Sequence, residues 1–106
     1  MKTKGLQSYK EIFGLAQQMR RASVSIPSNI AEGYTREHKT EYHRFLSIAY
    51  GSLSELETQY LLSIDLGYVK QNKVVEILMK EVGSMLYRIM HPKQQDTSIC
   101  ILNPIP

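Results

Sequence analysis

The feature that most constrains this chain is a proline inside a helical pattern. Pro27 lies in the stretch 15–33, LAQQMRRASVSIPSNIAEG, whose apolar residues recur every three or four positions. These residues are Leu15, Met19, Ala22, Ile26 and Ile30. Such spacing places them on one face of an α-helix. The stretch therefore predicts one helix that continues through the proline, and the alternative is a helix that ends at Ile26.

The same proline predicts a kink in this helix. Proline has no backbone N–H, and its ring presses on the carbonyl four residues earlier, here that of Ser23. The hydroxyls of Ser23, Ser25 and Ser28 are suited to bond backbone groups that proline leaves unpaired. We therefore predict a kink at Ser23 and Pro27, with Gly33 as the left-handed residue that ends the helix.

Two further helices are predicted downstream. The first runs from about Glu37 to Leu66, where apolar residues repeat close to a heptad. Gly51 in its interior suggests a close backbone approach, and Gly67 suits the position after its C-terminus. The second covers residues 70–91 and ends at His91-Pro92. Short linkers make such helices antiparallel neighbours, so the predicted fold class is an all-α, up-and-down helical bundle.

The chain of 106 residues reads as one domain with two flanking segments. Residues 1–14 are a short N-terminal segment with at most a helical turn, and residues 15–91 are the helical bundle domain. Residues 92–106 form a proline-containing C-terminal tail without a period. The tail has four apolar residues that are candidates for docking. They are Ile99, Ile101, Leu102 and Ile105.

The predicted helices carry more apolar surface than three helices can hide. The helix over 37–66 has a second apolar patch made of Ile48, Leu62 and Leu66. Two apolar stripes on one helix imply two neighbours. The helix over 15–33 has a second stripe of small residues, which lets another helix come close. We therefore expect either a further helix from outside this chain or self-association, with Ile48, Leu62 and Leu66 in the oligomer or partner contact.

Positive charge is concentrated in the first half of the chain. Residues 1–53 hold eight Lys and Arg against four Asp and Glu, a net of +4, whereas residues 54–106 hold five against six, a net of −1. A basic half is a pointer to a nucleic acid. The candidate phosphate contacts are Arg20, Arg21, Arg36, Lys39 and Arg44. The alternatives are solvated surface charge, or a role for Arg20 and Arg21 in bracing Glu32 or a neighbouring subunit.

The sequence predicts no enzyme. No catalytic group, cofactor site, metal site or small-molecule site is recognised, because His38, His43 and His91 lack ligand spacing and no phosphate-binding loop occurs. The single cysteine, Cys100, excludes an internal disulfide. No apolar run reaches the roughly 20 residues that span a membrane, and the N-terminus lacks the apolar core of a signal peptide. We therefore expect a cytoplasmic protein with no membrane partner.

Three motifs carry a resemblance to a known family. They are Arg20-Arg21, the string SIPSNIAEG at 25–33, and FL at 45–46 followed by GSLSELET at 51–58. Over about residues 13–90 the chain resembles the four-helix-bundle proteins encoded in intervening sequences of bacterial 23S rRNA genes. It is also similar, more distantly, to the accessory bundle protein of diversity-generating retroelements, a basic nucleic-acid-binding ring.

The resemblance implies an antiparallel four-helix bundle and a ring-like homo-oligomer, a pentamer, with a link to RNA. The chain departs from this pattern at its start. Members of the family carry a full amphipathic helix before the Arg-Arg segment, whereas only about a dozen residues precede Phe13 here. We therefore expect a shortened member, as from a truncated reading frame, with the first helix of the four-helix type largely missing or reduced.

Overall fold

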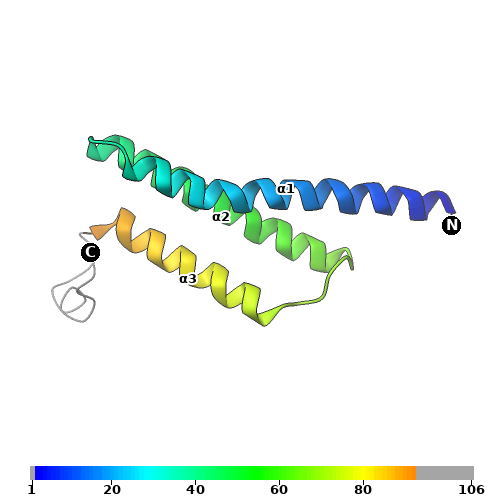
Figure 1. Ribbon diagram of the computed structural model, residues 1–106. Helices are drawn as coiled ribbons and strands as arrows, with labels where there is room; N and C mark the ends of the chain where they lie inside the picture. The colour runs from blue at the N-terminus through cyan, green and yellow to red at the C-terminus, as the bar shows by residue number, and fades with distance from the viewer. Residues whose placement is uncertain (1, 93–106) are drawn as a thin grey trace.

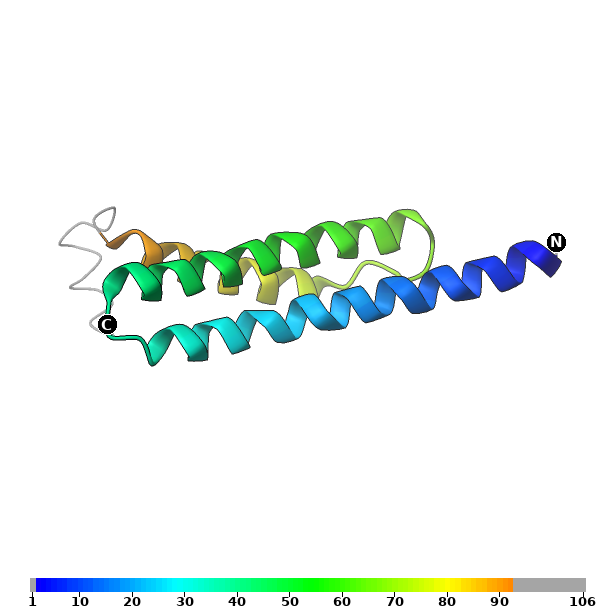
Figure 2. The same ribbon diagram turned by 90° about the horizontal axis from the view of Figure 1, so that it is seen from above.

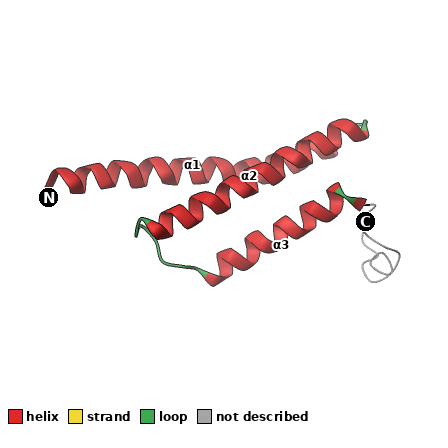
Figure 3. Ribbon diagram, turned by 180° about the vertical axis from the view of Figure 1, so that it is seen from behind, coloured by secondary structure: helices red, strands yellow, loops and turns green. Residues whose placement is uncertain are grey.

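The computed structural model describes residues 2–92, with side chains from Tyr9 onward, and consists of three α-helices. Helix α1 spans Lys2–Tyr34, α2 spans Lys39–Asp65 and α3 spans Lys73–Met90 (Figure 1). The all-α class is confirmed, and no strand occurs between residues 2 and 92 (Figure 3). A fourth helix is not among the described residues. The candidate docking residues of the tail, Ile99 to Ile105, lie outside them.

Helix α2 occupies the centre of an open, elongated arrangement. It runs antiparallel to α1 and to α3 and packs against both of them. The radius of gyration is 17.5 Å, against about 13 Å for a compact domain of 100 residues. Figure 2 shows why, because the N-terminal part of α1 extends past the α2–α3 connection. The three helices therefore form an incomplete bundle with a narrow core.

Helix α1 begins far earlier than the sequence pattern predicts. It is continuous from Lys2, so the segment before Leu15 is not a separate short turn. Glu11 anchors this part, because the Tyr68 hydroxyl in the α2–α3 connection donates a 3.0 Å hydrogen bond to Glu11 Oε1. Helical periodicity misses the segment because Tyr9 to Phe13 are exposed, so burial imposes no apolar period on them.

The helix also continues through Pro27, so an end at Ile26 is wrong. Pro27 and Ser23 are exposed, and the carbonyl that proline deprives of its N–H partner therefore faces water. The Ser23 hydroxyl donates instead to the Arg20 carbonyl, at 2.9 Å. A kink at this point stays a prediction.

Three polar side chains near Pro27 fix α1 against α2. Ser25 Oγ and Ser52 Oγ of α2 lie 2.8 Å apart, and Asn29 Nδ2 donates to both the carbonyl and the hydroxyl of Ser25. A hydrogen bond between partly buried hydroxyls contributes on the order of 1 kcal/mol. Ser25 therefore serves the helix contact rather than the backbone gap left by proline.

The core lies along α2, between its two neighbours. It is built from Ile26 of α1, Leu46, Ala49 and Leu53 of α2, and Leu86 of α3. At the other end of α2, the Tyr60 hydroxyl accepts a 2.7 Å hydrogen bond from the backbone N–H of Asn72. The side chain of Asn72 in turn caps α3 by accepting from the N–H of Val75.

Of the three glycines with a predicted role, one has that role and two do not. Gly67 has φ +79° and ends α2 in the left-handed conformation, as predicted. Gly33 lies inside α1 and does not have a positive φ. A Cβ there would lie 2.8 Å from Phe45 Cβ, so Gly33 permits close packing of α1 on α2. Gly51 has open space around it, and the predicted close approach there is wrong.

These glycines generate a matched pair of substitutions. Gly33→Ala should lower the free energy of unfolding by about 1 kcal/mol, because overpacking against a Cβ atom costs about 1–3 kcal/mol and exceeds the gain in helix propensity. Gly51→Ala should raise it by roughly 0.5–1 kcal/mol. Urea unfolding followed by circular dichroism at one fixed protein concentration measures both. Equal effects of the two substitutions would contradict the close packing at Gly33.

Candidate assembly and nucleic-acid surfaces

The predicted contact patch lies on the surface of α2. Ile48, Leu62 and Leu66 are 41%, 45% and 51% exposed. All three lie on the flank of α2 that points away from the core residues Leu46 and Leu53, because helix positions four and fourteen apart share a face. The structure thus leaves this patch without a partner among the described residues. Contact with another copy through it stays a prediction.

Large apolar side chains are exposed on the other helices as well. Those of α1 with more than half of their surface exposed are Tyr9, Phe13, Val24 and Tyr34. The predicted small-residue stripe lies on this side of α1 too. Of its members, Ser23, Pro27 and Ala31 are exposed and Ala16 is half-buried. The stripe is therefore not the side of α1 that packs on α2.

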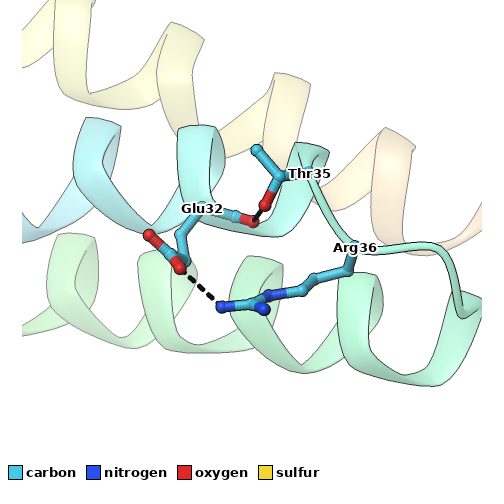
Figure 4. Close-up of polar contacts among 3 residues, drawn as sticks. All are labelled: Glu32, Thr35 and Arg36. Carbon is cyan, nitrogen blue, oxygen red and sulfur yellow. Dashed lines mark hydrogen bonds and ion pairs between the residues drawn. The ribbon is translucent and has the colours of Figure 1, made fainter.

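Three of the five predicted basic residues gather where α1 meets α2. The Arg36 guanidinium is paired with the Glu32 carboxylate, as Figure 4 shows. It also lies 5.0 Å from the ring centroid of Phe45, and Arg44 lies 5.4 Å from the same ring. Lys39 opens α2 beside them. Arg36 and Arg44 thus share one aromatic ring, which holds both guanidinium groups close to α2.

The helix end at this point explains the position of Arg36. Thr35 Oγ1 donates a 2.7 Å hydrogen bond to the Glu32 carbonyl, and the backbone N–H of Arg36 bonds the carbonyl of Gly33. These bonds satisfy carbonyls that the last turn of α1 leaves open. Arg36 is therefore directed back along α1, onto Glu32 (Figure 4).

Arg20 and Arg21 lie elsewhere. They are in the middle of α1, about 16–18 Å along the helix from Glu32, the ion-pair partner of Arg36, at 1.5 Å per residue. Both line a shallow hollow between α1 and α2. The five basic residues therefore do not form one patch. Glu32 pairs with Arg36, so it does not brace Arg20 or Arg21, and neither has an ion pair within residues 9–92.

A polar seam that sequence reasoning missed borders this hollow. Ser25, Ser52 and Glu55 line it, and Gln59 follows Glu55 one turn later, with Nε2 3.4 Å from Glu55 Oε2. Gln59 is buried, and its Oε1 has no hydrogen-bond partner within the described chain. An unpartnered buried acceptor costs about 1–3 kcal/mol. Polar residues at helix positions that face another helix were the only sequence signal for this seam.

Titratable side chains elsewhere offer little chemistry. Desolvation raises the pKa of the Tyr68 hydroxyl, and the hydrogen bond and charge of Glu11 raise it further. Tyr68 therefore remains a neutral donor to Glu11. The His43 and His91 rings are 6.5 Å apart, edge to face. Among the residues that the structure describes, no group of His, Cys, Asp or Glu is arranged to hold a metal ion, and no helix is long and apolar enough to cross a bilayer.

Comparison with known proteins gives a family match. The profile of a family described as "23S rRNA-intervening sequence protein" matches residues 2–88. This range includes all of α1 and α2 and nearly all of α3. No curated protein matches the chain.

The unpartnered acceptor generates a prediction for the isolated chain. Gln59→Met should raise the free energy of unfolding by about 1 kcal/mol, because it removes a buried oxygen without a partner and keeps the side-chain volume. Gln18→Met, an exposed change on α1, is the control and should have almost no effect. Chemical unfolding of the dilute chain measures both. A loss of stability in Gln59→Met alone would contradict an unpartnered Oε1.

Proposed function

This chain belongs to the family of 23S rRNA-intervening sequence proteins, and from that premise we propose that it is a non-enzymatic, self-associating helical-bundle protein. The observation that carries the proposal is its exposed apolar surface. Among the residues whose side chains the structure describes, sixteen large hydrophobic side chains are exposed, whereas seven hydrophobic residues are buried. Monomeric soluble proteins rarely leave contiguous apolar surface of this extent open, and such surface marks interaction sites.

The energetics support assembly through α2. Burying a leucine or isoleucine that was exposed is worth about 1.5–3 kcal/mol. Ile48, Leu62 and Leu66 are about half exposed, so covering the three contributes several kcal/mol per copy. A domain with a small core is marginally stable alone, and oligomerisation is one way in which small domains are stabilised. We propose that other copies of the chain, in the cytoplasm, cover this patch, with the pentameric ring of the family resemblance as the expected number of copies.

Substitution of the patch tests the assembly. Leu62→Glu combined with Leu66→Glu should weaken association at least a hundredfold, because two carboxylates would have to be buried without partners. Ser47→Glu combined with Ser54→Glu adds the same charge at two exposed positions on another face of α2; this matched control should leave the mass unchanged. Light scattering coupled to size exclusion, at equal concentrations, measures the mass. An unchanged mass in the double variant would contradict assembly through this patch.

A second candidate function is RNA binding through α1. The description of the family names 23S rRNA, and Arg20 and Arg21 have no ion pair in the described part of the chain. Unpaired guanidinium groups are suited to bind phosphates. Several copies in one assembly would repeat these two side chains and add weak contacts together. The alternative is a structural protein–protein interaction module without a nucleic-acid role.

Salt dependence separates these two functions. Arg20→Ala with Arg21→Ala should weaken binding to a single-stranded RNA probe. The fall of the logarithm of the association constant with the logarithm of the salt concentration should become less steep, by about 1.4 per chain. Lys73→Ala with Lys80→Ala removes the same charge from α3 and is the control. Fluorescence anisotropy across a salt series measures both. Binding equal in the two variants would exclude a specific role for the arginine pair, and no binding by the wild type would favour the structural module.

A further inference from the structure

One flank of α3 is apolar and has no partner among the described residues. We call it the outer flank of α3, and it consists of Val74, Leu78, Met85 and Ile89. These side chains are 63%, 53%, 54% and 44% exposed. Their spacings of four, seven and four place them on one face of the helix. The opposite flank is the one that contacts α2, because Gly83 lies against Leu53 and the Tyr87 ring against that of Tyr50.

The outer flank borders the core cluster to which both α1 and α3 contribute. Leu86 is in one core cluster with Ile26 of α1, and Met90 and Ile30 pack against that cluster. Val82, which also packs there, stands between Leu86 and the outer flank on the helix surface. A segment laid on the outer flank would therefore extend this core along α3. In an up-and-down bundle this is the position of the segment that follows α3 and runs back along it.

We propose that the chain's own C-terminal tail covers the outer flank of α3 through residues 99–105. The sequence continues for fourteen residues, 93–106, after the described part of the chain ends at Pro92. Four of them are the apolar residues Ile99, Ile101, Leu102 and Ile105. Acidic or basic groups are confined to the first part of the tail, at Lys93 and Asp96. The tail thus has a polar connection followed by an apolar segment of the kind the flank requires.

The lengths agree. Helix α3 has 18 residues and is about 27 Å long. Eight residues lead from Pro92 to Cys100, which is about 26 Å when extended. The apolar segment therefore reaches any level of the outer flank, from Ile89 to Val74. Pro104 and Pro106 prevent a long helix there, so the covering segment is short.

The tail is favoured over a second copy as the occupant because it is tethered. A segment joined to α3 by a few residues has an effective concentration in the millimolar range. A second copy must instead bear the loss of translational and rotational freedom on association. This inference does not depend on the proposed function, which uses a different patch, on α2.

The single cysteine gives a direct test. Cys100 lies inside the apolar segment, so a second cysteine on the outer flank, Leu78→Cys or Met85→Cys, should form an intrachain disulfide with it. Lys80→Cys and Ser84→Cys, at similar levels on other faces of α3, are the controls. Under the oxidant diamide, which accepts the two electrons and two protons released by the thiols, at least one outer-flank variant should close tenfold faster than its control.

The outcome is scored on the full chain by non-reducing gel and intact mass. Equal rates in outer-flank and control variants would overturn the proposal. Disulfides formed only between chains would overturn it too and would assign the flank to a second copy. The mass of the unoxidised wild type is measured alongside, and it tests self-association separately.

A change in the tail guards against disulfides formed by mere proximity. Ile101→Glu with Leu102→Glu in the Leu78→Cys and Met85→Cys variants leaves both thiols in place and makes the segment polar. The rate of disulfide formation in these variants should fall to that of the controls. An unchanged rate would show that apolar docking does not hold the tail, and the proposal would fail. Helix content by circular dichroism confirms that each variant remains folded.

Discussion

The packing of α1 and α3 on the two sides of α2 is the interaction on which the rest of this structure depends. Leu46, Ala49 and Leu53 are almost fully buried, and each helix neighbour contributes one residue to the same cluster, Ile26 and Leu86. The backbones of α1 and α3 approach α2 and not one another. One row of small and aliphatic residues on α2 therefore determines whether three helices form a bundle at all.

This dependence makes the helix contacts close and the core small. Gly33 allows α1 to approach Phe45, and a Cβ at Gly83 would lie 3.2 Å from Leu53 on the other side. Ser25 and Ser52 add a polar contact that defines the register of α1 on α2. The remaining apolar surface of each helix faces outward. A core that is one row of residues wide buries only one side of a helix that is apolar on two sides. Exposed apolar flanks are thus a direct consequence of the architecture, and they are the physical reason to expect partners for this protein.

Much of this arrangement is readable from the sequence, and the rest has identifiable physical reasons. The bounds of α2 and α3 follow from heptad-like spacing, from Gly67 and from His91-Pro92. The exposure of Ile48, Leu62 and Leu66 follows from counting two stripes on one helix. The start of α1 does not, because Tyr9 to Phe13 are exposed and their burial therefore imposes no period. The role of Gly33 depends on the position of Phe45 in the next helix, which local patterns do not contain.

The basic residues show the same limit. Charge counting identifies a positive half of the chain but not the rotation of each side chain about its helix. The structure therefore separates Arg20 and Arg21 from Arg36, Lys39 and Arg44, and pairs Arg36 with Glu32. The unpartnered Oε1 of Gln59 likewise could not be predicted from the sequence. Whether a buried atom has a hydrogen-bond partner depends on the folded surroundings of that atom.

Sedimentation equilibrium of the wild-type chain over a hundredfold range of concentration tests most directly whether other copies of the chain cover the apolar patch on α2. We expect a mass that is an integral multiple of the 12.2 kDa chain and that falls toward one chain only at the lowest concentrations. A mass of one chain throughout the range, with the helices intact, would contradict it.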